Sequence, residues 1–235
     1  MILILSDIHA NLSALEAVLK EAYRKYDITA LILLGDIVNY GMRPNETICR
    51  IKKIQTPAIA NIWGNHEEAV IYRKYERFSS RRGAECAMYT TERLSPDSKK
   101  YITSEMNPSG FEEFTIGSLT CLAVHGSPDD FFWKSISPSR AREGYSTFDV
   151  VFSGHSHIPH YFETCDKECE RKTVFINPGS VGQPRNLNPR AQYSVFDSEN
   201  MQFFFCCAEY DIALEQGLYN DDIHPYYKER LSRGT

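Results

Sequence analysis

Short apolar segments alternate with helix-patterned segments over the first 62 residues, and this alternation constrains the fold more than any other feature. The apolar segments cover residues 2–5, 30–34 and 58–62. Between them, residues 12–26 and 44–54 carry apolar side chains at the spacing of one helix face. Strands that alternate with helices in this way indicate an α/β layer fold.

The first two helices also have recognisable starts. Asn11 is a plausible N-cap for the helix that follows it, because its side-chain oxygen can accept a bond from a free backbone N–H. Pro44 stands where proline is favoured at the first turn of the second helix, whose apolar face consists of Ile48, Ile51 and Ile54.

The remaining sequence does not continue this regular alternation of strands and helices. Residues 67–107 are charged and helix-patterned, with Ser95 as an N-cap and Pro96 in the first turn. The strands expected after them are a hairpin that turns at Gly117-Ser118, the runs "DVVF" and "TVFI", and a closing antiparallel pair, "QYSVFD" and "MQFFFCCAEY"; a helix at 211–221 ends the pattern. No repeat or linker is visible, so we predict a single domain, 1–235, with a helical insertion at about 67–107.

Composition narrows the class of protein. The net charge of −5 argues against broad binding to a nucleic-acid backbone. Seven scattered cysteines do not form a disulfide framework. No apolar run approaches the length of a membrane span, and Met1 leads directly into a strand-like segment, so we expect a cytoplasmic protein without membrane contact.

Polar side chains follow several of the apolar runs at the point where each expected strand ends. They are Asp7 and His9, Asp36, Asn65 and His66, His125, and His155 and His157. Five of the seven histidines lie in these clusters, and only His160 and His224 do not. Loops that leave the carboxyl ends of neighbouring strands converge, so we expect one shared site.

Taken singly, each cluster has a structural explanation. Asp7 could cap the first helix, His125 could be a satisfied core histidine, and Asn65 could hold a turn. Their ordered occurrence together instead favours a dinuclear metal site. Two divalent ions about 3.5–4 Å apart can activate water and neutralise the charge that develops during phosphate-ester hydrolysis. Asp36, which follows Gly35, is the natural bridging ligand.

These motifs resemble those of the calcineurin-like metallophosphoesterases, and most closely their small bacterial and archaeal phosphodiesterase branch. The similar motifs are Asp7-Ile8-His9, Gly35-Asp36, Gly64-Asn65-His66-Glu67, His125-Gly126, Gly154-His155-Ser156-His157 and the late loop "NPGSVGQPR". The resemblance implies a four-layer α/β/β/α sandwich of two mixed sheets.

The resemblance also implies roles for the site residues. One metal would be bound by Asp7, His9 and His157, a second by Asn65, His125 and His155, and Asp36 would bridge them. His66 would face the leaving group as general acid or transition-state stabiliser rather than bind metal. Imidazole and carboxylate ligands suit manganese, iron or zinc, and manganese is favoured.

The loop after the bridging aspartate departs from the wider superfamily. Protein phosphatases carry Asp-Arg-Gly there, whereas this chain has Asn39 and Tyr40. A phosphoprotein substrate is therefore not expected. The Asn39 amide can orient His66, but it cannot stabilise an imidazolium by charge.

Candidate substrate contacts are weaker predictions. Gly179 and Ser180 could form an anion-binding turn, Arg185 could grip phosphate, and Asn11 is a further candidate; a simple turn between strands explains the loop equally well. The basic run at 73–82 and the aromatics at 131–133 could hold a second phosphate and a nucleobase, or could be a solvated helix face and core or subunit-contact packing.

These observations predict a dinuclear-metal-dependent phosphoesterase that hydrolyses phosphodiester or phosphoanhydride bonds of small nucleotide-like substrates. The alternatives within enzymes are a phosphomonoesterase and a dinucleoside polyphosphate hydrolase. The alternative of another class is a non-catalytic interaction scaffold on the same fold, which the presence of all seven ligands and His66 disfavours. The sequence leaves homo-oligomerisation open.

Overall fold

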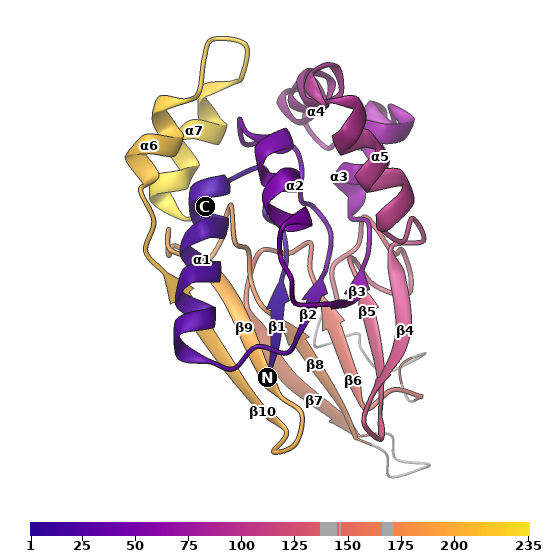
Figure 1. Ribbon diagram of the computed structural model, residues 1–235. Coiled ribbons are helices and arrows are strands. Elements are labelled where there is room, and N and C mark those ends of the chain that lie inside the picture. Colours follow the sequence, from indigo (N-terminus) through magenta and orange to yellow (C-terminus); the bar gives the residue numbers. More distant parts are fainter. Residues whose placement is uncertain (137–144, 146, 166–171) are drawn as a thin grey trace.

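Two five-stranded mixed sheets flanked by helices form the molecule in the computed structural model, which describes residues 1–136, 145, 147–165 and 172–235 (Figure 1). The first sheet has the strand order β10-β9-β1-β2-β3. Its strands are β1 (Ile2–Leu5), β2 (Ala30–Leu33), β3 (Ala58–Asn61), β9 (Ala191–Asp197) and β10 (Gln202–Ala208). β1, β2 and β3 are parallel, and β9 runs antiparallel to both β1 and β10. The fold class predicted from the sequence is confirmed.

The second sheet has the strand order β4-β5-β6-β8-β7. Its strands are β4 (Phe111–Ile116), β5 (Leu119–Val124), β6 (Val150–Ser153), β7 (His160–Cys165) and β8 (Lys172–Asn177). β5, β6 and β8 are parallel to one another, and the edge strands β4 and β7 run antiparallel to β5 and β8, respectively. The parallel strands of both sheets place their carboxyl ends near one end of the molecule, beneath the helices of the upper part of Figure 1.

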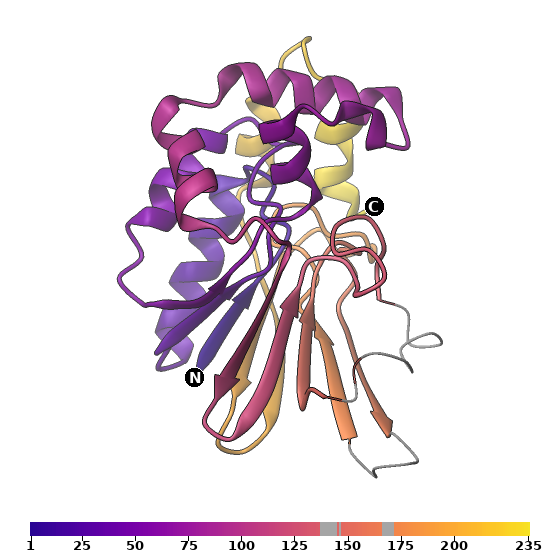
Figure 2. The same cartoon turned by 90° about the vertical axis from the view of Figure 1, so that its right-hand side faces the viewer.

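Helices cover the first sheet and this end of both sheets (Figure 2). They are α1 (Leu12–Lys25), α2 (Pro44–Lys52), α3 (Asn65–Tyr72), the 3₁₀ turn Tyr75–Arg77, α4 (Arg81–Arg93), α5 (Pro96–Glu105), α6 (Ile212–Gly217) and α7 (Pro225–Arg233). None of the helices that the structure describes is long and apolar enough to cross a bilayer.

Side chains of the first sheet alternate between its two faces, and an apolar core lies on each face. Leu3 and Leu5 of β1 pack with the buried face of α1, whereas Ile2 and Ile4 point the other way, into the space between the sheets. Phe152 of β6 meets them there from the second sheet. Because strand side chains alternate between faces, a four-residue strand buried on both sides must be apolar throughout, as β1 is.

The predicted helix starts are confirmed by their caps. Asn11 Oδ1 accepts a hydrogen bond from the Ala14 N–H at 3.0 Å and begins α1. Ser95 Oγ accepts from the Ser98 N–H at 3.1 Å, with Pro96 in the first turn of α5. These bonds satisfy N–H groups that a helix leaves free at its start.

Two elements were not predicted. β7 is an edge strand whose side chains alternate between half-buried and exposed, so "HYFETC" offers no continuous apolar run that would reveal it. α7 is strongly polar and begins at Pro225 after the His224 cap. It packs against α6 and contributes to the candidate site described next.

Candidate metal centre

The predicted ligand residues lie at sharp backbone turns directly after the strands. Asp7, His9, Asp36, His155 and His157 all have positive φ, between 48° and 64°. Non-glycine residues rarely adopt this left-handed conformation, which costs on the order of 1–3 kcal/mol each when the surroundings impose it. The turns at the ends of β1, β2 and β6 thus direct these side chains toward one point.

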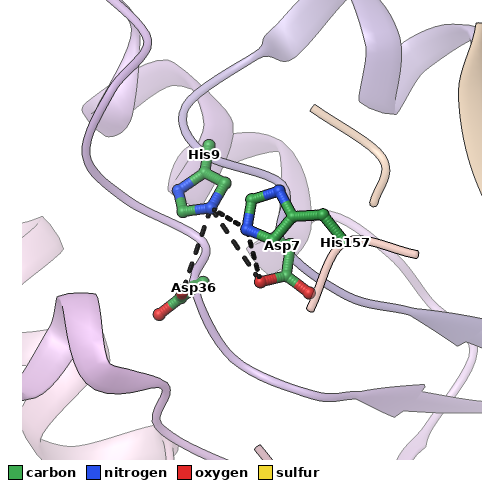
Figure 3. Close-up of side chains that lie close together, drawn as sticks. All are labelled: Asp7, His9, Asp36 and His157. Atoms are coloured by element: carbon green, nitrogen blue, oxygen red, sulfur yellow. Dashed lines mark hydrogen bonds and ion pairs between the residues drawn. The ribbon is translucent and has the colours of Figure 1, made fainter. Parts of the chain in front are cut away.

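Four of these side chains form a first cluster, in which Asp7, His9, Asp36 and His157 point toward one another (Figure 3). Their nearest ligand atoms all lie within 4.8 Å of one another. His157 Nε2 lies 3.1 Å from Asp7 Oδ1 and 3.1 Å from His9 Nε2. His9 Nε2 lies 3.8 Å from Asp36 Oδ2. All four residues are buried.

A second cluster shares Asp36 with the first. It contains His125 and His155, again with ligand atoms within 4.8 Å of one another. Asn65 Oδ1 joins it, at 3.0 Å from His125 Nε2 and 2.9 Å from His155 Nδ1. Asp36 Oδ2 lies 3.3 Å from His125 Nε2, so a single carboxylate oxygen adjoins both clusters. The division into two ligand sets matches the one that the resemblance implied.

Backbone carbonyl groups orient three of the imidazole rings. Nδ1 of His9, His125 and His157 lies 3.2, 2.7 and 2.6 Å from the carbonyl oxygens of Val38, Leu34 and Gln183, respectively. Each Nδ1–H can therefore donate to a carbonyl, which leaves the Nε2 lone pair facing the cluster. This arrangement is typical of metal-binding histidines, because it fixes both tautomer and ring direction.

Unpaired oxygens show that the clusters fit divalent cations. Asp7 Oδ1 and Asp36 Oδ2 are buried, and neither has a hydrogen-bond partner among the described residues. Their second oxygens are held: Asp7 Oδ2 accepts from Ser6 Oγ and the His155 N–H, and Asp36 Oδ1 accepts from the His66 N–H. A buried carboxylate oxygen without a partner is costly, and a cation bound by it would remove that cost. The oxygen and imidazole donor set suits such an ion.

The pKa shifts favour the protonation states that metal binding requires. Burial lowers the pKa of His9, and burial together with the neighbouring His125 lowers the pKa of His155 to about 4. Burial raises the pKa of Asp7, but the charge and hydrogen bond of His157 and the charge of His125 together outweigh it, so the pKa of Asp7 is lowered overall. Neutral imidazoles and ionised carboxylates are the forms that bind metal.

His125 behaves differently. Burial lowers its pKa, but the Asp36 carboxylate more than offsets this and raises the pKa of His125 to about 9. Without a cation, a proton on His125 thus compensates the buried charge of Asp36. A cation beside Asp36 would take over that role.

His66 lies beside the clusters, with its Nε2 3.8 Å from Asp36 Oδ2. Its Nδ1 lies 2.7 Å from Asn39 Nδ2, and Asn39 Oδ1 accepts a bond from the Thr90 hydroxyl at 3.1 Å. Because the amide nitrogen is the donor, His66 Nδ1 must accept, and the ring hydrogen is on Nε2. Burial lowers the pKa of His66 to about 4, which favours this neutral form.

Glu67 has a role that the sequence did not reveal, although it belongs to the quoted motif. Its carboxylate accepts hydrogen bonds from the N–H groups of Asp36, Ile37, Val38 and Gly64, at 2.7 to 3.1 Å. It thereby ties the loop after β2 to the start of α3, which positions Asp36. Sequence spacing does not show that these two loops lie close together. The role of Glu67 could therefore be found only from the structure.

Three of the predicted substrate contacts face away from the clusters. Asn11 caps α1 with its oxygen and donates to the Gly182 carbonyl at 3.0 Å. Ser180 Oγ donates to the Asp7 carbonyl at 2.7 Å, and a Cβ on Gly179 would meet the side chain of Gln192. These residues support the loop that follows β1, and none of the three lines the cavity described next.

A cavity of about 580 Å³ opens over the ligand clusters. Asp36, Asn65, His155 and His157 lie at its base with His66. Arg185 lines it, and the backbone N–H of Arg185 donates to the His157 carbonyl at 3.2 Å. This volume falls within the range of small-molecule sites, roughly 300–1,000 Å³.

The basic run and the aromatic segment are each divided between the cavity and other surroundings. Arg77 and Arg82 line the cavity, whereas Lys74 pairs with Glu68 and Arg81 pairs with Glu85 on the surface. Trp133 lines the cavity too. Of its neighbours, Phe131 packs on Phe111, and Phe132 packs against the core and Gly110.

Comparisons with known proteins agree with this geometry. The profile of the calcineurin-like phosphoesterase superfamily domain matches residues 1–201. An uncharacterized protein of Methanocaldococcus jannaschii is 31% identical over 223 residues, which are 90% of this chain and 88% of that protein.

Two crystal structures extend the comparison to the whole fold. A metallophosphoesterase from Sphaerobacter thermophilus is 30% identical, with a TM-score of 0.78 over 100% of this chain and 98% of the other. A hypothetical protein from Pyrococcus horikoshii OT3 is 20% identical, with a TM-score of 0.82 over 100% and 99% of the two chains. The chain belongs to the calcineurin-like phosphoesterase superfamily, and this membership together with its buried His/Asp clusters supports a metal-binding phosphoesterase.

Proposed function

We propose that the protein is a dinuclear-metal-dependent phosphoesterase that hydrolyses phosphodiester or phosphoanhydride bonds of small nucleotide-like molecules. The observation that carries the proposal is the shared position of Asp36, whose unpaired oxygen adjoins two ligand sets at the base of one cavity. A non-catalytic scaffold would not need two metal-ligand sets at the base of a cavity that fits a small ligand.

In this proposal, Asp7, His9 and His157 hold one divalent ion, Asn65, His125 and His155 hold the other, and Asp36 bridges. Imidazole, carboxylate and amide-oxygen donors suit manganese, iron or zinc, of which manganese is favoured, and the absence of thiolate argues against a closed structural zinc site. Bound there, the two ions would supply Lewis acidity that activates water and neutralises charge on the phosphate.

His66 acts on the leaving group. Its Nε2–H lines the cavity, and its Nδ1 is held by Asn39. A neutral imidazole in this tautomer can donate a hydrogen bond from Nε2–H to the oxygen that departs from phosphorus. The negative charge that develops on that oxygen makes the bond stronger in the transition state than in the bound substrate.

Arg185 contributes to substrate binding. It lies close enough to His66 and His157 for its charge to lower the pKa of both, after the larger effect of burial. Its Nε has no hydrogen-bond partner among the described residues. A guanidinium in this position can bind an oxygen of the phosphate group while the ions hold others.

Hydrolysis of bis-p-nitrophenyl phosphate with added manganese tests the proposal. The wild type is expected to release nitrophenol only when metal is present. His66→Ala should lower kcat by about 10²–10³-fold, as removal of a hydrogen-bond donor to developing charge does, while metal content stays unchanged. His224→Asn, which keeps a capping side chain at the start of α7, is the histidine control and should retain full activity. Absence of metal-dependent hydrolysis for any ester of a broad panel would favour the scaffold instead.

A further inference from the structure

The wall of the cavity opposite the ligand clusters is built from cations. Arg77 and Arg82 come from the region between β3 and β4, and Arg230 comes from α7. Among the described residues that line the cavity, Asp36 at the base provides the single carboxylate. Arg77 pairs with Asp130, but no Asp or Glu side chain in the described part of the chain forms an ion pair with Arg82 or Arg230. These two guanidinium groups therefore lack an acidic side-chain partner among the described residues.

Arg230 is a buried cation in this wall. Its residue is only 7% exposed, and its Nε donates to the main-chain oxygen of Thr235. Burial, followed by the nearby charge of Arg185, lowers the pKa of Arg230 to about 10. A buried guanidinium close to another cation is costly unless an anion joins them.

The aromatic rings of the cavity support these arginines. The guanidinium carbon of Arg82 lies 4.1 Å from the centroid of the Tyr226 ring, and that of Arg230 lies 4.9 Å from the same centroid. The ring of Tyr227 stacks on Tyr40 at 4.5 Å. The Tyr226 ring is therefore poorly placed to stack on a nucleobase, and it instead fixes the direction of the two guanidinium groups.

We infer that Arg82 and Arg230 bind a second phosphate group of the substrate, beyond the phosphate at the ligand clusters. This inference rests on the proposed function and deepens it: the substrate class is compounds with at least two phosphates, such as phosphoanhydride-linked molecules, selected by phosphate number rather than by base. Arg230 lies on α7, outside residues 1–201 that the family profile matches.

The substitutions Arg82→Gln and Arg230→Gln test the inference, each with a neighbour on the same helix as control. Arg81 and Arg233 pair with Glu85 and Glu229 on the surface, so Arg81→Gln and Arg233→Gln remove the same charge outside the cavity. Circular dichroism confirms folding of each variant. Arg82→Gln keeps the test valid should loss of the Arg230 contact with Thr235 impair folding.

The kinetic measurement compares two substrates in the manganese-loaded enzyme. Diadenosine triphosphate carries additional phosphates, and bis-p-nitrophenyl phosphate carries one. The ratio of their kcat/KM values should fall at least tenfold in Arg82→Gln and Arg230→Gln, mainly through KM, because a charge-assisted bond to phosphate is lost. Both control variants should keep the wild-type ratio. An equal fall for the two substrates would show a structural effect and overturn the inference.

Binding provides a readout that does not depend on turnover. Isothermal titration with inorganic tripolyphosphate in manganese-containing buffer should give at least tenfold weaker binding for Arg82→Gln and Arg230→Gln than for the wild type and both controls. Equal affinities would contradict the inference even if the enzyme is active. If the wild type hydrolyses no ester, the proposed function fails, and the titration still decides whether this wall binds phosphate.

Discussion

Asn39 Nδ2 lies 2.7 Å from His66 Nδ1, and the direction of that amide is set by the Thr90 hydroxyl, which donates to Asn39 Oδ1 at 3.1 Å. The sequence places an amide where protein phosphatases of the superfamily have a carboxylate, and the structure gives the consequence. The Asn39 amide donates to the ring rather than accepting from it, so the neutral Nε2–H form of His66 is favoured.

Asn39→Asp should reverse this relationship. A carboxylate of similar size would accept a bond from His66 Nδ1–H and favour the imidazolium, so the pKa of His66 should rise from about 4 toward its usual 6.5. We expect an NMR titration of the metal-free protein to give His66 a pKa at least one unit higher in Asn39→Asp than in the wild type.

The control for this change is Asn45→Asp, because the Asn45 amide lies on α2 and donates to the Arg93 carbonyl. It should leave the pKa of His66 unchanged. An unshifted His66 pKa in a folded Asn39→Asp protein would contradict the assigned tautomer of His66.

Gly64→Ala should displace the bridging carboxylate. A Cβ at this position would lie 2.1 Å from Asp36 Oδ1, and the backbone of Gly64, with φ of −99°, accepts alanine without strain. We expect a stability loss of about 1–3 kcal/mol in urea denaturation, together with reduced metal content. Gly217→Ala, where nothing lies within 4 Å, should change neither quantity. Full metal content in Gly64→Ala would mean that Asp36 does not bridge.

The pH dependence of stability follows from the site histidines when metal is removed. The pKa of His66 and that of His155 are lowered to about 4 by burial, so their contribution is present above pH 6.5 and is lost as pH falls from 6.5 toward 4. His125 acts in the opposite sense. Asp36 overcomes burial to raise its pKa to about 9, so its contribution is present below pH 6.5 and is lost as pH rises toward 9.

Thermal denaturation in EDTA should therefore give the highest Tm near pH 6.5. His155→Gln should flatten the acid side and His125→Gln the alkaline side. A Tm that rises steadily from pH 6.5 to 4 would be inconsistent with burial of neutral imidazoles.

The sequence predicted that the ligand side chains of the candidate metal centre would lie together because each of them lies within four residues after a strand. Parallel strands bring their carboxyl ends together whatever the length of chain between them. Asp7 and His157 are 150 positions apart, yet both lie directly after buried strands, so neither depends on a long loop for its placement. The assigned metal roles, the single-domain organisation and the cytoplasmic location stay predictions.

The substrate side was harder to predict because it depends on contacts between segments without a local pattern. Arg230 lies on a polar helix that no apolar face reveals, and it reaches the site only because α7 packs over Tyr40. Arg82 and Arg81 are neighbours of equal charge, and the helix turn alone decides which one lines the cavity. Gly179 and Ser180 were expected to bind phosphate through backbone N–H groups, and neither residue lines the cavity.

The metal stoichiometry of the purified protein tests the central claim most directly. Mass-spectrometric analysis of protein reconstituted with manganese and freed of excess ion should give two equivalents per chain for the wild type and for His66→Ala. Asp36→Asn, which removes the shared charge, should bind less than one. Two equivalents in Asp36→Asn, or fewer than one in the wild type, would contradict the dinuclear site on which the proposed function stands.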